Sequence, residues 1–270
     1  MADYIEGRRA VEEALRAGVP IKRIYVQASA SAAKPDPKKG KPGRSSDRAA
    51  DPVLEKLVAE ARQGGAPVER VDRAVLDRLS AEGRSHGAHQ GIICEVPPYR
   101  YTDITAIAKA GAAKPASLVL VLDHITDEGN LGAIIRTAEV MGADGVVIPS
   151  KRAAQVTVGV YKTSAGAAFH VPIARVPNLV TALGTLKEAG FWVAGASEQA
   201  REDIWHAPLG GRIALVAGNE GSGISRLVQE ACDFFVALPQ RGHVGSLNVA
   251  QATTAICYEW LRRCMCGDGR

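Results

Sequence analysis

The chain has 270 residues and a formal net charge of +4, with 46% hydrophobic and 23% charged residues. This length and composition suit two globular domains and exclude a disordered or fibrous chain. No apolar run reaches the roughly 18–20 residues that span a bilayer, and the first residues lack the pattern of a signal peptide. We therefore expect a cytoplasmic protein with no membrane partner.

The first 98 residues predict a small α/β domain. Apolar residues recur at helical spacing in the first helix, and Gly18 is a plausible stop for it. Short runs rich in Val and Ile predict the strands, and Pro97-Pro98 ends the domain. The expected helices are 7–17, 52–62 and 74–79, and the expected strands are 21–26, 68–71 and 91–96.

A basic insertion at 29–51 interrupts this domain. Its central part, 34–48, holds six Lys or Arg and two Asp, together with three Pro and two Gly. Such a segment buries too little apolar surface to offset its ordering entropy. The mild positive charge of the whole chain is compatible with a polyanionic partner. The insertion is therefore either a solvated loop or a tether that binds phosphates.

A linker carrying a weak helix is expected at 99–116, followed by a second domain at 117–270. Here strands alternate regularly with helices, which predicts an α/β fold with a mostly parallel sheet. The expected strands are 117–123, 145–149, 171–176, 191–196, 213–217 and 234–239. The expected helices are 130–141, 159–169, 178–189 and 248–263.

Three loops of the second domain follow its strands, and ligands of parallel sheets bind beyond the carboxyl ends of strands. In the first loop, 124–130, Asn130 is expected to cap the next helix, with Arg136 on a broad face of that helix. The second loop, 217–223, is rich in glycine and contains Glu220, which has no evident packing purpose.

The third loop runs from 238 to 248, and Ser246 or Asn248 is expected to cap the helix after it. A Ser nucleophile of the hydrolase type is disfavoured because the Gly-x-Ser-x-Gly elbow is absent. The glycine loop matches neither Gly-x-Gly-x-x-Gly nor a phosphate loop, which argues against a nucleotide-dependent oxidoreductase. No metal site is expected, since Cys264 and Cys266 lack a second pair of ligands.

Together, these loops resemble the three signature motifs of the TrmH/SpoU family of RNA ribose methyltransferases. The matching segments are 130–136 (NLGAIIR), 218–223 (GNEGSG) and 238–250, which begins Leu-Pro and ends SLNVA. More weakly, 6–15 and 87–91 (GAHQG) look like the substrate-binding domain of the RlmB group, which acts on a guanosine of 23S rRNA. The basic insertion departs from the compact form of that domain.

The resemblance implies S-adenosylmethionine as the cofactor, RNA as the partner, a homodimer, and a trefoil knot in the second domain. By position, Gly218, Leu238 and Leu247 would line the cofactor pocket, largely through backbone groups. In the first domain, His89 and Gln90 would contact RNA, although a purely structural loop explains them equally well.

The resemblance also implies a catalytic role for Arg136. Because arginine stays protonated, we expect it to clamp a phosphate and stabilise the developing alkoxide rather than act as a base. Asn130, Glu220, Ser246 and Asn248 would orient the backbone, the substrate and this arginine. The expected activity is 2′-O-methylation of RNA, most simply of 23S rRNA. A tRNA substrate and a non-catalytic RNA-binding or ribosome-assembly factor remain as alternatives.

Overall fold

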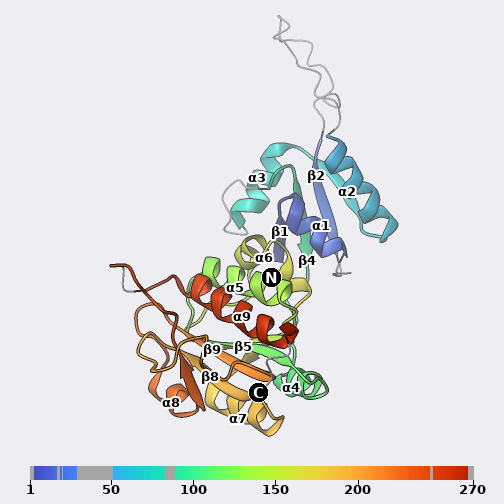
Figure 1. Cartoon of the computed structure of the whole chain (residues 1–270). Helices are drawn as coiled ribbons and strands as arrows, with labels where there is room; N and C mark the ends of the chain where they lie inside the picture. The colour runs from blue at the N-terminus through green and yellow to red at the C-terminus, as the bar shows by residue number, and fades with distance from the viewer. Residues whose placement is uncertain are drawn as a thin grey trace, which may run out of the picture. The chain divides into compact units, whose positions relative to one another are not determined.

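The computed structural model describes residues 3–16, 19, 21–28, 51–82, 89–243 and 246–266. The chain divides into two units, Met1–Pro98 and Tyr99–Arg270 (Figure 1). Apart from Asp51, the predicted basic insertion at 29–51 lies outside the described residues.

The first unit is an α/β domain built on one mixed sheet. Its strand order is β1-β4-β2-β3, with β2 and β3 parallel and the other pairs antiparallel. Strand β1 was not predicted, because its sequence, Asp-Tyr-Ile-Glu, shows no alternation of apolar and polar residues. In chain order the described elements are β1 (Asp3–Glu6), α1 (Arg8–Arg16), β2 (Arg23–Gln27), α2 (Pro52–Gln63), β3 (Val68–Val71), α3 (Arg73–Glu82) and β4 (Ile92–Val96).

The second unit is an α/β domain with a parallel six-stranded sheet, which confirms the predicted fold class. The strand order is β10-β8-β9-β5-β6-β7, and every neighbouring pair is parallel. The trefoil knot implied by the resemblance stays a prediction. The strands are β5 (Ser117–Asp123), β6 (Gly145–Pro149), β7 (Ile173–Val176), β8 (Trp192–Ala196), β9 (Arg212–Gly218) and β10 (Phe234–Val236).

Helices cover both faces of this sheet, as a strand buried along its whole length requires. All seven residues of β5 are buried. One face carries α4 (Ile104–Ala112), α7 (Leu179–Glu188) and α8 (Arg226–Glu230), whose apolar side chains form one core with β5 and β9. The other face carries α5 (Glu128–Val140), α6 (Val158–Thr163) and α9 (Val249–Cys266) (Figure 1).

The segment 99–116, expected to be a linker, contributes to the second unit. Asp103 caps α4 by accepting a hydrogen bond from the Thr105 amide at 2.8 Å. The helix buries Ile107 and Ala108 in the core that it shares with α7. This segment therefore belongs structurally to the sheet that follows it.

The single helix predicted at 159–169 is interrupted in the structure. The helix α6 ends at Thr163, and a 3-10 turn, η2 (Ala167–Phe169), follows. Between them Ala165 (φ 52°) and Gly166 (φ 89°) adopt left-handed backbone conformations, which a continuous right-handed helix does not tolerate. The small residues of this segment carry no signal for that break.

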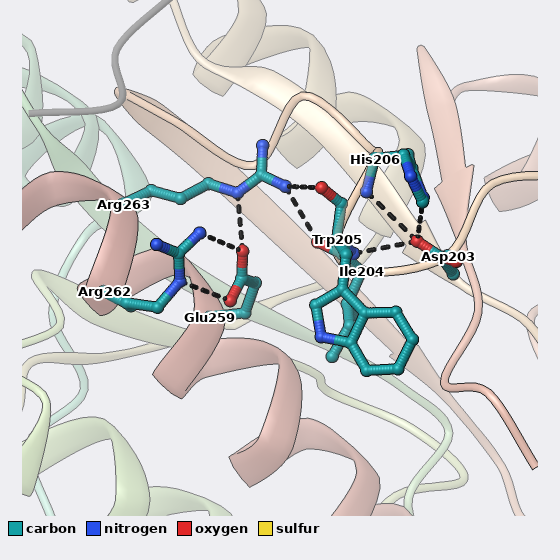
Figure 2. Close-up of polar contacts among 7 residues, drawn as sticks. All are labelled: Asp203, Ile204, Trp205, His206, Glu259, Arg262 and Arg263. Carbon is teal, nitrogen blue, oxygen red and sulfur yellow. Dashed lines mark hydrogen bonds and ion pairs between the residues drawn. The ribbon is translucent and has the colours of Figure 1, made fainter. Parts of the chain in front are cut away.

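The carboxyl end of α9 is fixed by a buried acidic residue, Glu259, with 7% of its side chain exposed (Figure 2). Its carboxylate accepts hydrogen bonds from Arg262 at 2.9 and 3.0 Å and from Arg263 at 2.8 Å. These guanidinium groups lower the pKa of the Glu259 carboxyl to about 2. Arg263 also donates to the carbonyls of Ile204 and Trp205, which ties the loop between β8 and β9 to the helix.

Candidate active site

The three predicted loops leave the same edge of the parallel sheet. Residues 124–127 follow β5, residues 219–225 follow β9, and residues 237–248 follow β10. The first two loops are joined where Asn219 donates its side-chain amide to the carbonyl of His124 at 3.0 Å. The carboxyl ends of β5 and β9 thus bring distant sequence segments together, as the strand–helix alternation predicts.

A hydrogen-bonded network links all three loops through Asn130, Glu220 and Asn248. The Asn130 side-chain amide donates to Glu220 Oε1 at 2.9 Å. Asn248 Nδ2 donates to the same oxygen at 2.8 Å and to Asn130 Oδ1 at 2.8 Å. Three of the predicted site residues therefore meet in the structure, although they are up to 118 positions apart in sequence.

The N-terminal cap of α5 differs from the prediction. The side chain of Asp127, and not that of Asn130, caps the helix by accepting from the Asn130 amide at 2.7 Å. Asn130 lies within the first turn, so its side chain is free to join the network. The prediction for α9 is confirmed, since Asn248 Oδ1 accepts from the Ala250 amide at 2.9 Å.

The glycine loop folds back on itself as a tight hairpin. Asn219 and Gly223 exchange backbone hydrogen bonds of 3.0 and 2.8 Å. Gly223 has a φ of 67°, and a Cβ atom on Gly218 would lie 2.3 Å from the Gly223 carbonyl carbon. Position 218 therefore excludes a side chain because the backbone of the returning strand already fills that space.

A cavity of about 680 Å³ opens beside the network. Its size lies within the usual range of small-molecule and cofactor sites, roughly 300–1,000 Å³. All three predicted cofactor residues, Gly218, Leu238 and Leu247, lie in its lining. Predicted catalytic residues in the lining are Glu220, Ser246 and Asn248.

The lining fits a nucleoside-bearing cofactor. The apolar residues Val236, Leu247 and Ile256 line the cavity, together with the glycine loop 218–223. Ala196 at the end of β8 and the loop after it, residues 197–199, contribute to the lining as well. Sequence reasoning missed that loop, which contains no motif or unusual run of glycines.

Arg136 stands apart from the network. It lies on α5 and is exposed, and its side chain makes no hydrogen bond or ion pair with any residue in the described ranges. Its neighbour Thr137 contacts Thr254 of α9 at 2.8 Å through the two hydroxyl groups. Its guanidinium is thus available to an external anion, but the structure does not bring it to the Asn130 network.

His89 and Gln90, predicted to contact RNA, both have structural partners in the first unit. The Nδ1 atom of the buried His89 ring accepts from the Gly91 amide at 3.0 Å, which leaves Nε2 to donate to Asp77 at 3.0 Å. Gln90 accepts from the Arg8 amide at 3.2 Å. Their contact with RNA stays a prediction.

A buried carboxylate that sequence reasoning missed, Asp123, connects two of the loops that form the site. Asp123 is 1% exposed at the end of β5, accepts from the Ser225 amide at 2.6 Å, and contacts His124 Nδ1 at 2.5 Å. It therefore fixes both ends of the junction between the first two loops. In the sequence it is indistinguishable from any polar residue that ends an apolar strand.

In the described part of the chain there is no group of three or more His, Cys, Asp or Glu side chains placed to hold a metal ion. No helix there is long and apolar enough to cross a membrane.

Comparisons with known proteins agree with this geometry. The model of the SpoU rRNA Methylase family matches residues 117–258, and a model described as RNA 2′-O ribose methyltransferase substrate binding matches residues 4–39 and 45–102. A Bacillus subtilis relative, whose name places it in the TrmH family of tRNA/rRNA methyltransferases, is 36% identical over 262 residues. The match covers 97% of this chain and 96% of the relative.

Two solved structures share the fold. The SpoU methyltransferase AviRb from Streptomyces viridochromogenes, in complex with AdoMet, has a TM-score of 0.74 at 23% identity and covers 96% of this chain and 89% of its own. An AdoMet-bound rRNA methyltransferase from Sinorhizobium meliloti has a TM-score of 0.73 at 24% identity, covering 97% and 87%. Both similarities extend over the two units of the chain.

Proposed function

The chain belongs to the SpoU rRNA methylase family of RNA 2′-O-methyltransferases, and we propose that its substrate is a guanosine of 23S rRNA and its methyl donor S-adenosylmethionine. The cavity beside the Asn130–Glu220–Asn248 network carries the part of this proposal that concerns the methyl donor. It combines space for a cofactor with polar groups drawn from three loops at one edge of the sheet. The same cofactor is present in the two related solved structures.

The network would hold the glycine loop and the start of α9 in place around the cofactor. S-adenosylmethionine, when bound, supplies an electrophilic methyl group. The task of the chain is then to place the ribose hydroxyl in line and exclude water. Glu220 and Asn248, which line the cavity and are held by Asn130, are the residues placed to orient the substrate. Ser246, on the same lining, exposes a further hydroxyl.

Arg136 would act on the charge that develops during the reaction. Its exposed guanidinium has no partner among the described residues, so it is free to bind a substrate phosphate. A fixed cation beside the attacking oxygen stabilises the alkoxide as it forms. Transfer of the methyl group to the ribose oxygen would convert the sulfonium of the donor into a neutral thioether, and the hydroxyl proton would pass to a nearby acceptor such as the substrate phosphate.

The match of the first unit to a model of an RNA 2′-O ribose methyltransferase substrate-binding domain supports RNA as the partner. The rRNA methyltransferase from Sinorhizobium meliloti has the same two-unit extent, because the similarity covers 97% of this chain. A tRNA substrate remains the competing specificity, since the name of the Bacillus subtilis relative includes both RNAs.

A homodimer in the cytoplasm is part of the same proposal. Exposed apolar side chains lie on two helices that pack against each other: Val140 on α5 is 61% exposed, and Tyr258 and Met265 on α9 are 52% and 77% exposed. A second copy of the chain would cover such a surface. Sedimentation velocity should therefore give a dimer, and a monomer at micromolar concentration would contradict this point.

Methyl transfer to isolated RNAs tests the function directly. The purified full chain is incubated with deuterated S-adenosylmethionine and either unmodified 23S rRNA or unmodified tRNA, and nucleosides are identified by mass spectrometry. We expect labelled 2′-O-methylguanosine from rRNA. Label in tRNA alone would overturn the substrate, and RNA binding without label in either RNA would favour the non-catalytic alternative.

A further inference from the structure

The loop that follows β6, residues 150–157, presents two cations that the site described above does not use. Lys151 and Arg152 are adjacent and exposed, and neither side chain makes a hydrogen bond or ion pair within the described ranges. Some other cations of this unit are paired, since Lys187 binds Asp233 and Arg226 binds Glu230. The cations of the 150–157 loop are therefore free to bind an external anion.

The conformation of the 150–157 loop is held by hydrogen bonds. Gln155 holds it closed from inside, since its side-chain amide lies 3.0 Å from the carbonyl of Pro149, 3.1 Å from that of Ala153 and 3.2 Å from that of Ala154. The Val156 amide donates to the Tyr101 hydroxyl at 3.0 Å. The two cations thus project from a loop whose backbone is fixed on both sides, which lowers the entropy lost on binding.

The backbone at Arg152 is left-handed, with a φ of 56°. Residues other than Gly, Asn and Asp rarely adopt this conformation, because their Cβ atom crowds the carbonyl oxygen. Arginine is therefore strained at this position, where glycine would adopt the same φ without strain. Strained backbone positions of this kind cluster at functional sites such as active sites and ligand-binding loops.

This loop adjoins the active site. Strands β5 and β6 are parallel neighbours, so their following loops leave the same edge of the sheet. The Ala154 amide donates to the carbonyl of Ile125 at 2.8 Å. Ile125 belongs to the loop that leads to Asn130, so the two cations lie on the segment bonded directly to the catalytic loop.

We propose that Lys151 and Arg152 bind phosphates of the RNA strand next to the ribose that is methylated. This inference rests on the proposed function, because it assumes that RNA enters at this edge. The ligand is a phosphate rather than a base, since the 150–157 loop has no aromatic side chain on which a base could stack and the side-chain nitrogen of Gln155 already donates to backbone carbonyls. Such contacts position the strand without reading its sequence.

The salt dependence of RNA binding tests this proposal. The full chain and the variants Lys151→Ala and Arg152→Ala are titrated with a 23S rRNA fragment between about 50 and 200 mM salt. Each substitution should reduce the slope of log K against log salt by about 0.7–0.9, the value for one phosphate contact. The KM for RNA should rise, while cofactor affinity and turnover at saturating RNA stay unchanged. Unchanged slopes in both variants would overturn the proposal.

Two further variants separate charge from loop conformation. Lys109→Ala removes one exposed cation from α4, which packs with α7 on one face of the sheet, and should leave the slope unchanged. Arg152→Gly removes the cation but relieves the left-handed strain, so it should match Arg152→Ala in slope while unfolding at higher urea. An Arg152→Gly variant with a normal slope would show that loop shape, not charge, affects RNA.

The outcome is separable from that of the proposed function. Methyl transfer by the unmodified chain tests the function, and the salt slopes test the 150–157 loop whether or not transfer occurs. If the unmodified chain transfers no methyl group but the variants have shallower salt slopes, the RNA contact is supported and the enzyme activity is rejected. If the unmodified chain transfers methyl groups and the variants have unchanged slopes, the enzyme activity is supported and the RNA contact of the 150–157 loop is rejected.

Discussion

Substitutions of Asn248 separate two roles that one side chain performs. Its Oδ1 caps α9 by accepting from the Ala250 amide at 2.9 Å. Its Nδ2 donates to Glu220 and to Asn130, both at 2.8 Å. Serine preserves the cap but is too short to reach the network, aspartate preserves the cap but replaces the donors with a second carboxylate, and alanine removes both functions.

The structure gives different orders for stability and for activity. Loss of an N-cap costs about 1 kcal/mol, and the two partly exposed side-chain bonds together contribute about 1 kcal/mol more. Asn248→Ala should therefore lower the free energy of unfolding by about 2 kcal/mol, and Asn248→Ser by about 1 kcal/mol. Asn248→Asp keeps the cap and its charge favours the helix N-terminus, but repulsion by Glu220 offsets this gain, so its stability should lie near that of the alanine variant.

Activity should rank Asn248→Asp last. Its carboxylate would face Glu220 across a distance that is now a hydrogen bond, and like charges about 4 Å apart repel by about 1–4 kcal/mol at a protein surface. Turnover should fall at least about tenfold below that of Asn248→Ala. Urea unfolding and single-turnover methylation measure the two orders. Equal stability of the serine and alanine variants, or near-normal turnover in the aspartate variant, would refute this account of Asn248.

Three further predictions concern other residues. Arg136→Ala should reduce single-turnover methylation roughly a hundredfold, with unchanged cofactor affinity in calorimetry. Arg136→Lys should restore only part of the rate. Near-normal turnover in the alanine variant would show that Arg136 is not part of the catalytic centre. Gly218→Ala should abolish binding of S-adenosylhomocysteine, because its Cβ would meet backbone atoms at 2.3 Å, whereas Gly184→Ala, with open space around it, should bind normally. Glu259 has a lowered pKa, so the stability it contributes is present above about pH 4.5 and is lost as pH falls toward 2. Glu259→Gln should cost about 1–2 kcal/mol at neutral pH in urea unfolding, and a deficit that persists unchanged at pH 3 would contradict the assigned cause.

The sequence was sufficient to predict the sheet and the loops that carry the site. Apolar runs such as 117–123 identified the strands, and the parallel arrangement placed the three loops at one edge. Motif resemblance then selected Asn130, Glu220 and Asn248, which the structure brings into one network. The strands and their common edge depend on local patterns and on a general rule for parallel sheets, whereas the choice of these three residues depends on the resemblance to a known family.

The remaining features depend on choices that local patterns do not rank. Both Asp127 and Asn130 are good N-cap residues three positions apart, and only tertiary contacts decide between them. The break after α6 depends on the left-handed backbone of Ala165, a residue with no preference for it. Asp123 and the 150–157 loop act through long-range hydrogen bonds, which leave no periodic trace in the sequence.

The position of the α5 cap connects the fold to the site. Because Asp127 satisfies the first free amides of the helix, the side chain of Asn130 can bridge to Glu220. Asn248 joins the same network from the first turn of α9, so two helix starts and the glycine loop share one set of hydrogen bonds. The cavity wall is therefore assembled only when α5 and α9 are both docked. Cofactor binding should in turn stabilise that docking, since a ligand that binds only the assembled wall shifts the equilibrium toward it.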